Sequence, residues 1–396
     1  MKTVYLDNNA TTMVAPEVFE AVRPFLTERY GNPSSMHSFG GSVAHDVVKA
    51  REALAQLLGA APQEVIFTSG GTESDSTAIL SALATMPERR EIVTTRVEHP
   101  AVLNLCKHLG RFKGYSIRWL SVGKDGMLDM DEVRAKITDQ AAVVSVMWAN
   151  NETGVIFPVR EIVEIARAHG ALMHTDAVQA VGKIPMELGS SDINFLSLSG
   201  HKLHAPKGIG ALYIKKGTRF SPFVIGGHQE SDRRGGTENV PGIVGLGEAA
   251  RLAMKNFDEE NSRVRKLRDR LQEGLLSAIT AAQVNGHQKS RLPNTLNVGF
   301  EFVEGEAILM RMDDKGICAS SGSACTSGSL EPSHVLRAMG VPFTSVHGSI
   351  RFSLSRYNTE DEIEYVIQEL PGIVEFLRSM SPFGREYLSS SVCATR

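Results

Sequence analysis

One lysine stands where Schiff-base chemistry could take place. Lys202 closes the run Ser199-Gly200-His201-Lys202, which follows the apolar residues 193–196. Those residues predict a buried strand, so the lysine is expected at a strand end with serine and histidine beside it. A confined lysine that loses its proton can attack a carbonyl carbon. Taken alone, the segment fits an exposed loop lysine better.

A second candidate nucleophile, Cys325, lies in a run of small residues between Cys318 and Ser329. A structural cysteine normally has apolar neighbours, so this composition favours a thiol on a mobile arm. Such an arm could take a sulfur atom from a substrate and then hand it on. A loop cysteine without function is the alternative. Cys318 continues an apolar run and is interpreted as structural.

Four further polar residues follow predicted strands or lie on one. Asp176 ends the strand predicted over 171–176, where a carboxylate could hold a proton on a heterocyclic nitrogen or simply cap a helix. His99 could stack on a ring and transfer protons, and Asn151 could bind a hydroxyl. Arg351 could pair with a carboxylate through two hydrogen bonds. A structural histidine, a turn asparagine and a structural ion pair are the alternatives for these three.

The run Ser69–Ser74 combines a strand end, two glycines and a predicted helix start. Backbone N–H groups at a helix N-terminus bind phosphate, and Thr72 could add a hydroxyl. The pattern is neither a Walker loop nor a GxGxxG motif, and an ordinary capped helix explains it equally well. The glycine-rich, basic run 226–239 could form a second anion contact, a subunit interface or a surface loop.

The hydrophobic pattern predicts an α/β protein with a largely parallel sheet, because strands and helices alternate. Strands are expected over 65–68, 92–95, 117–122, 143–149, 171–176, 193–197 and 209–214. Apolar residues at helical spacing from Val264 to Ile279 predict a long amphipathic helix that leads into a smaller α+β domain. We expect an N-terminal segment, 1–14, that packs with the small domain, a large domain over 15–257 and a small domain over 258–396.

The composition excludes several classes of protein. The chain has 396 residues, a net charge of −3 and four cysteines without a CxxC pair. No general attraction to nucleic acid or to an anionic membrane is implied, and neither a zinc site nor a disulfide scaffold is indicated. The sequence shows no signal-like or membrane-spanning apolar run, so a cytoplasmic location is expected.

Several motifs occur together in one order. They are Gly-Gly-Thr-Glu-Ser at 70–74, Glu-His-Pro at 98–100, His-Thr-Asp-Ala-Val-Gln at 174–179, Ser-Gly-His-Lys at 199–202 and Ser-Ser-Gly-Ser-Ala-Cys-Thr-Ser-Gly at 320–328. In this combination the chain resembles the cysteine desulfurases of the NifS/IscS class, in the class-V aminotransferase family, over nearly its whole length. The segment Leu-Asp-Asn-Asn-Ala-Thr-Thr at 6–12 favours the nitrogen-fixation type of cysteine desulfurase.

The resemblance implies a pyridoxal-phosphate enzyme of fold type I, similar to aspartate aminotransferase, with a mostly parallel mixed sheet in the large domain. It implies a homodimer with active sites at the interface. Lys202 would carry the cofactor as a Schiff base, His99 would stack on its ring, and Asp176 would pair with the ring nitrogen. Further cofactor contacts are expected from Gly71, Thr72, Asn151, Gln179, Ser199, His201 and the partner subunit's Thr237. Substrate contacts are expected from Arg351, Asn9, His37 and Asn151.

The implied reaction removes sulfur from L-cysteine, leaving L-alanine and a persulfide on Cys325. An iron–sulfur scaffold protein of the NifU/IscU kind would accept the sulfur, for use in nitrogenase. No structural metal is expected, and Cys325 would ligate iron–sulfur species only transiently. The alternatives are a selenocysteine lyase, another fold-type I enzyme such as an aminotransferase, and a non-catalytic assembly scaffold. A nicotinamide-binding oxidoreductase is disfavoured because no GxGxxG follows an early strand.

Overall fold

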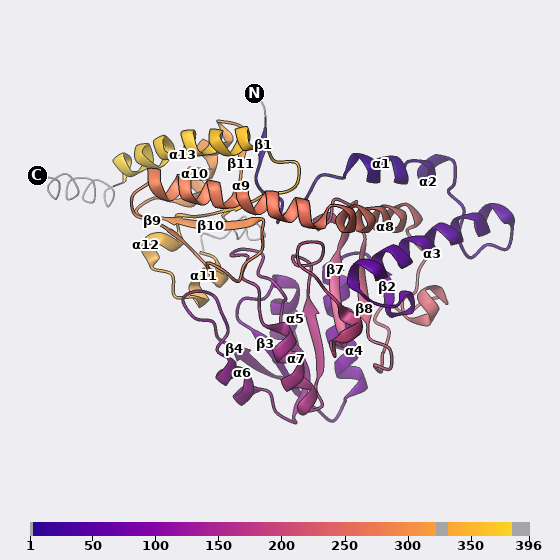
Figure 1. The fold of residues 1–396 in the computed structure, drawn as a ribbon. Coiled ribbons are helices and arrows are strands. Elements are labelled where there is room, and N and C mark those ends of the chain that lie inside the picture. The colour runs from indigo at the N-terminus through magenta and orange to yellow at the C-terminus, as the bar shows by residue number, and fades with distance from the viewer. Residues whose placement is uncertain (1–2, 322–331, 382–396) are drawn as a thin grey trace, which may run out of the picture.

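The computed structural model describes residues 3–321 and 332–381. A seven-stranded sheet forms the centre of the molecule, with helices on both of its faces (Figure 1). In spatial order the strands are β2 (Val65–Thr68), β8 (Gly210–Ile214), β7 (Phe195–Ser199), β6 (Leu172–Asp176), β5 (Ala141–Ser145), β3 (Glu91–Thr95) and β4 (Ser116–Leu120). Only β8 runs antiparallel to its neighbours. The predicted α/β fold with a mostly parallel mixed sheet is confirmed.

Several strand boundaries differ from the prediction, and two of the differences lie beside residues of the cleft described below. The strand that precedes Lys202 continues to Ser199, so the lysine lies in a single 3₁₀ turn, η3 (Gly200–Lys202). The strand predicted over 143–149 ends at Ser145. The apolar residues that follow it, including Met147 and Trp148, are buried in loop structure instead.

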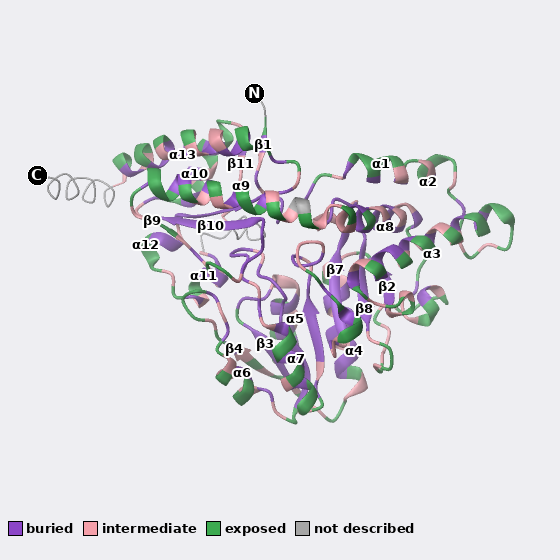
Figure 2. Cartoon of the chain, in the orientation of Figure 1, coloured by how far each residue is buried: buried purple, intermediate pink, exposed green. Residues whose placement is uncertain are grey.

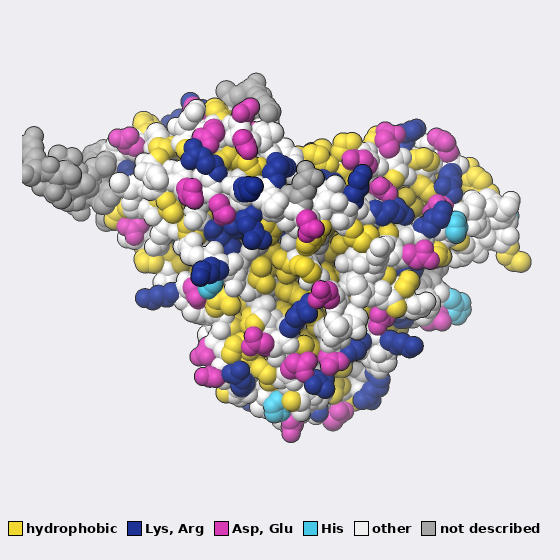
Figure 3. Space-filling view, viewed as in Figure 1, with side chains coloured by type: hydrophobic (Ala, Val, Ile, Leu, Met, Phe, Trp, Pro, Cys, Tyr) yellow, Lys and Arg dark blue, Asp and Glu magenta, His cyan; other side chains and the backbone are white. Residues whose placement is uncertain are grey.

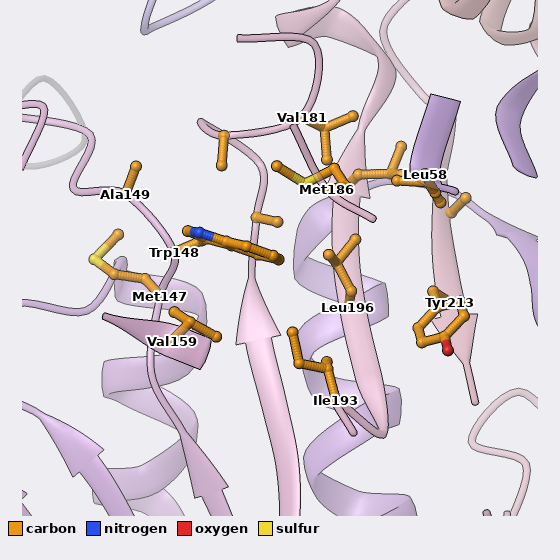
Figure 4. Packing of buried hydrophobic residues seen from close by; sticks show 14 of the residues in the cluster. Leu58, Met147, Trp148, Ala149, Val159, Val181, Met186, Ile193, Leu196 and Tyr213 are labelled. Carbon is orange, nitrogen blue, oxygen red and sulfur yellow. The ribbon is translucent and has the colours of Figure 1, made fainter. Parts of the chain in front are cut away.

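Separate hydrophobic clusters cover the two faces of the central sheet. On one face, α4 (Gly71–Thr85) and α5 (Pro100–Lys113) pack against the strands. The helices of the other face are α3 (Ser38–Leu58), α6 (Met130–Lys136), α7 (Val159–Ala168) and α8 (Val240–Lys255). Two short helices, α1 (Pro16–Val22) and α2 (Pro24–Thr27), belong to the same cluster and pack against α8. Figure 4 shows part of this second cluster, where Trp148 and Leu196 pack between the sheet and the segment that carries Val181 and Met186.

The local sequence explains where the early helices begin and end. Pro24 lacks an amide hydrogen, so α1 ends before it and the short helix α2 begins there. The longer α3 begins after His37, whose Nδ1 accepts a hydrogen bond from the Gly40 amide at 3.1 Å. It ends at Gly59, which adopts a left-handed conformation with φ of 63°.

A smaller antiparallel sheet lies beside the central one, in the order β12 (Ser349–Ser353), β10 (Thr295–Phe300) and β9 (Ala282–Val284). Its helices are α9 (Phe257–Ala278), α10 (Gly305–Asp313), α11 (His334–Ala338), α12 (Phe343–Val346) and α13 (Glu360–Met380). The predicted amphipathic helix is α9, whose apolar positions join a third hydrophobic cluster. Near the N-terminus, β1 (Val4–Tyr5) pairs with β11 (Ile317–Cys318) and so ties the first residues to this part of the molecule.

The surface is mixed in character. Most strands are buried, the strands β4 and β9 are partly exposed, and the outer faces of the helices are exposed (Figure 2). Lys and Arg side chains alternate with Asp and Glu over the face shown in Figure 3. None of the helices in the described part of the chain combines the length and apolar character needed to span a bilayer. Three further 3₁₀ turns are η1 (Pro62–Glu64), η2 (Leu188–Ser190) and η4 (Gln229–Asp232).

Candidate active site

A cleft of about 300 Å³ opens at the carboxyl edge of the parallel strands, beside the smaller sheet. This edge is where α/β sheets commonly bind ligands. The cleft brings together most of the residues that the sequence singled out. They are Asn9, Gly71, Thr72, His99, Asn151, Asp176, Gln179, Ser199, His201, Lys202 and Arg351.

Lys202 is held by the N-terminal segment. Its Nζ donates a hydrogen bond to the backbone oxygen of Ala10 at 2.7 Å and another to the backbone oxygen of Asn9. The Asn9 oxygen also accepts from Gln179 Nε2 at 3.0 Å. Residues near position 10 therefore orient an amine that lies more than 190 positions later in the chain.

Asp176 and Lys202 meet because of the register of two neighbouring parallel strands. Asp176 ends β6 opposite Ser197 of β7, and the turn after β7 carries the lysine. Asp176 Oδ1 accepts a hydrogen bond from the Val178 amide at 2.9 Å. Burial raises the pKa of this carboxyl, and the neighbouring His99 opposes the rise. The carboxylate is thus poised to pair with a cation that enters the cleft.

The two histidines of the cleft are neutral. His99 precedes α5 as its N-terminal cap, and its Nδ1 accepts from the Ala101 amide at 3.2 Å. Since Nδ1 is an acceptor, the proton of the neutral ring lies on Nε2. Burial lowers the pKa of His99, although Asp176 opposes the shift. Burial also lowers the pKa of His201 to about 4, with Lys202 adding to the effect.

The start of α4 forms the end of the cleft suited to an anion. Gly71 and Thr72, in the first turn of this 15-residue helix, line the cleft beside Ser199 and His201. The turn that leads into the helix touches β8 closely, because a Cβ on Gly210 would lie 2.6 Å from the Gly70 Cα. The first-turn N–H groups and the hydroxyls can together hold a phosphate.

Arg351 lies on β12 and reaches the cleft from the smaller sheet. Its Nη2 donates to Asp7 Oδ1 at 2.7 Å, and its Nη1 donates to the backbone oxygen of Asn151 at 3.0 Å. The Nε is buried and has no hydrogen-bond partner. Its guanidinium is thus fixed by two contacts and keeps one buried donor unsatisfied, as a binding site for a substrate carboxylate requires.

Two of the predicted residues, His37 and Thr237, are not among the described residues that line the cleft. His37 caps α3 through Nδ1, which is the turn chemistry that its neighbours suggest. Thr237 lies in the segment between η4 and α8. Cys325 lies outside the described residues. Asn9, expected at the cleft mouth, is buried, and its Nδ2 donates to Thr295 Oγ1 at 2.9 Å, so it fixes the N-terminal segment as well.

Sequence reasoning missed Asp75, Ala10, Met147 and Val178, which also line the cleft. Asp75 follows Gly71 by four positions on α4, and this helical spacing places the two on one face. That spacing is the signal that could have revealed the acid. Ala10, Met147 and Val178 are apolar and carry no comparable signal.

The residues present fit pyridoxal phosphate. An amine, a buried acid and a helix N-terminus surround one cleft, and they match the aldehyde, the ring nitrogen and the phosphate of that molecule. The buried carboxyl oxygen Oδ1 of Asp75, which lacks a hydrogen-bond partner, also suits a site that receives a polar ligand.

Comparison with known proteins identifies the family of the chain. The family model for class-V aminotransferases matches residues 4–366. A cysteine desulfurase of Trichormus azollae is 59% identical over 383 residues, covering 97% of this chain and 96% of the relative. The cysteine desulfurase NifS of Azotobacter vinelandii is 57% identical over 384 residues, covering 97% and 95%. A solved structure described as a NifS-like protein superposes with a TM-score of 0.89 at 38% identity, covering 95% of this chain and all of that one.

These relatives share nearly the full length of the chain, and the solved structure shares its fold. Both the large sheet and the smaller one therefore have counterparts in a known architecture, the fold type I of pyridoxal-phosphate enzymes. The chain belongs to the class-V aminotransferase family and, within it, to the cysteine desulfurases of the NifS class.

Proposed function

We propose that this chain binds pyridoxal phosphate in the cleft and removes the sulfur atom of L-cysteine, leaving L-alanine and a persulfide on Cys325. The observation that carries the proposal is the convergence of Lys202, Asp176, His99 and Arg351 on one cleft. When bound, the coenzyme supplies an electron sink next to the substrate Cα. The protein's own residues bind, orient and transfer protons.

Lys202 would hold the coenzyme through Nζ and, once displaced by the substrate amine, would take the Cα proton. The backbone oxygens of Asn9 and Ala10 already accept hydrogen bonds from Nζ. These two oxygens would hold the displaced amine beside the cleft, and they would stabilise its positive charge once it has taken the proton. Asp176 would keep the ring nitrogen protonated.

His99 would stack on the coenzyme ring and assist proton transfers. Its neutral state suits this role, because a neutral ring can stack on the coenzyme and Nε2–H can donate a hydrogen bond, while Nδ1 is held by the Ala101 amide. Arg351 would bind the substrate carboxylate through its unsatisfied Nε and a neighbouring nitrogen. Asn151 and Gln179 would contact the hydroxyl side of the ring.

Gly71, Thr72, Ser199 and His201 would hold the phosphate. The remaining phosphate contact would come from the partner subunit's Thr237, so we propose a homodimer with each cleft completed across the interface. His37 would then act near the mouth of the cleft only in the assembled dimer. We further propose that the chain divides into an N-terminal segment, 1–14, that packs with the small domain, a large domain over 15–257 and a small domain over 258–396.

The sulfur transfer needs a second nucleophile. The thiolate of Cys325 would attack the sulfur of the substrate, forming an S–S bond while the Cβ–S bond breaks and the carbon skeleton leaves as alanine. We propose that the persulfide passes to an iron–sulfur scaffold protein of the NifU/IscU kind in the cytoplasm, for nitrogenase assembly. Support for the nitrogen-fixation role comes from the relative named NifS in Azotobacter vinelandii.

The test is incubation of the purified chain with L-cysteine and mass measurement of its cysteine peptides. We expect one added sulfur on the Cys325 peptide, and alanine rather than a keto acid as product. Cys325→Ala should keep the bound coenzyme and lose sulfur release, whereas the matched control Cys318→Ala should keep both. Undiminished sulfur release by Cys325→Ala would refute the role of that thiol.

A further inference from the structure

Asp75 is a buried acid of the cleft for which the proposed mechanism has no task. It lies on α4 and lines the cleft together with Asp176 and Lys202. The residue is only 1% exposed, and its Oδ1 has no hydrogen-bond partner. A buried carboxylate oxygen without a hydrogen-bond partner is costly, so its presence needs a physical explanation.

A buried imidazole lies beside this acid. His174 Nε2 is 3.4 Å from Asp75 Oδ1 and 3.0 Å from Ser197 Oγ, and its Nδ1 is 2.8 Å from Ser145 Oγ. The ring is fully buried, and this burial lowers the pKa of His174 to about 4. The neutral ring therefore provides no positive charge to the neighbouring carboxyl.

Strand register builds this polar layer. His174 and Asp176 lie two residues apart on β6 and so point to the same face of the sheet, which α4 covers. Ser145 of β5 is the register partner of His174, and Ser197 of β7 is the register partner of Asp176. The hydroxyls, the imidazole and both acids thus form one continuous polar cluster directly behind the cleft.

The cluster contains more acids than the expected ligand can match. The titratable groups around Asp75 are Asp176 and His174 from β6, Glu98 and His99 at the start of α5, and Lys202 after β7. A protonated ring nitrogen brings one positive charge, which can pair with one carboxylate only. Burial raises the pKa of Asp75 to about 7, although the Ser197 hydroxyl opposes the rise.

We propose that Asp75 is a positioning residue that stays protonated when the coenzyme is bound. The neutral carboxyl of Asp75 lies against His174 and Ser197. Asp176 is then the one negatively charged acid of this cluster, and it pairs with the protonated ring nitrogen. A second carboxylate would leave an uncompensated buried charge. This inference rests on the proposed function, because the ring nitrogen is the counterpart of Asp176.

The test is the infrared spectrum of the full chain at pH 6, with and without pyridoxal phosphate. Exposed carboxyls are ionised at this pH, so a carbonyl band of a protonated acid reports buried groups. Asp75→Asn should remove one such band. The matched control is Glu73→Gln on the same helix, whose carboxylate pairs with Arg234 at 2.9 Å and has a lowered pKa. Glu73→Gln should keep the carbonyl band of the protonated acid and lose only absorption from an ionised carboxylate.

The coenzyme provides a second readout. Asp75→Asn should keep the visible absorption of the bound coenzyme and its affinity within about threefold, since asparagine is neutral like the protonated acid. Asp176→Asn should change that absorption, because the ring nitrogen loses its counter-charge. Should Asp75→Asn fail to fold, Ser197→Ala replaces it and should shift the acid band in frequency without removing it.

Glu98 is also buried and protonated at this pH, and its band is identified by its loss in Glu98→Gln. A spectrum in which Asp75→Asn removes no acid band, or an Asp75 band that Ser197→Ala leaves unshifted, overturns the inference. So does an asparagine variant that loses the coenzyme while Asp176→Asn keeps it. If the chain binds the coenzyme but shows no acid band from Asp75, the inference about Asp75 is refuted and the proposed function is not. A chain that shows the band but binds no pyridoxal phosphate refutes the proposed function, and with it the role of Asp75 toward the ring.

Discussion

Glu98 allows a quantitative test of the electrostatics behind the cleft. The side chain is fully buried, and its Oε1 accepts hydrogen bonds from Thr95 Oγ1 at 2.9 Å and from the Met147 amide at 3.0 Å. Its Oε2 has no partner. Burial raises the pKa of this carboxyl from 4.5 to about 8. At neutral pH the folded chain therefore keeps a proton that the unfolded chain releases.

An acid with a raised pKa in the folded chain stabilises the fold most at low pH. The stability is fully present below about pH 4.5 and falls as the pH rises to about 8, because only the unfolded chain ionises in this window. Each pH unit costs about 1.4 kcal/mol, so the total loss from Glu98 is roughly 5 kcal/mol. Glu98→Gln keeps the shape and the accepting oxygen but cannot ionise.

The free energy of unfolding of Glu98→Gln should therefore stay close to that of the unsubstituted chain at pH 5. At pH 8 the free energy of unfolding of Glu98→Gln should exceed that of the unsubstituted chain by up to roughly 5 kcal/mol. Urea unfolding followed by circular dichroism across this range measures both proteins, and their difference isolates Glu98, because Asp75 and Asp176 titrate in both. A control, Glu364→Gln, removes an exposed carboxylate paired with Arg270 and should show no such rise. A difference that does not change with pH would refute the reasoning.

Three further outcomes are expected. Arg351→Lys removes the planar guanidinium and with it one charged hydrogen bond, which contributes about 1.5–3 kcal/mol. The KM for L-cysteine should therefore rise roughly 10- to 200-fold, with a smaller change in kcat. An unchanged KM would contradict carboxylate binding by this residue. Leu271→Ala empties a fully buried position of α9, and urea unfolding should show a loss of about 2–5 kcal/mol. Glu230→Gln breaks the buried pair with Arg51 at 2.6 Å and should cost about 3 kcal/mol in the same assay, whereas a change near zero would show that the pair is not stabilising.

Local sequence patterns determined the fold class and most of the cleft. Alternating apolar strands and amphipathic helices are enough to predict a parallel α/β sheet, because period and turn chemistry depend on neighbouring residues only. Since parallel strands place their carboxyl ends at one edge, residues such as Asp176 and Lys202 can be assigned to a common site from the order of the strands alone.

Contacts between distant segments could not be predicted in this way. The ion pair between Asp7 and Arg351 joins residues 344 positions apart, and the hydrogen bonds to the amine of Lys202 come from the backbone of Asn9 and Ala10. Backbone oxygens carry no signature in the sequence. Their positions depend on how the N-terminal segment packs between the two sheets.

The sequence by itself determined which residue types are available for chemistry, namely an amine, an acid, an arginine and a thiol in family motifs. Only the tertiary structure decided their surroundings: that β8 runs antiparallel, and that Asp75 lies buried beside His174. The physical reason is that pKa values and hydrogen bonds depend on burial and on neighbours through space, which local periodicity does not encode.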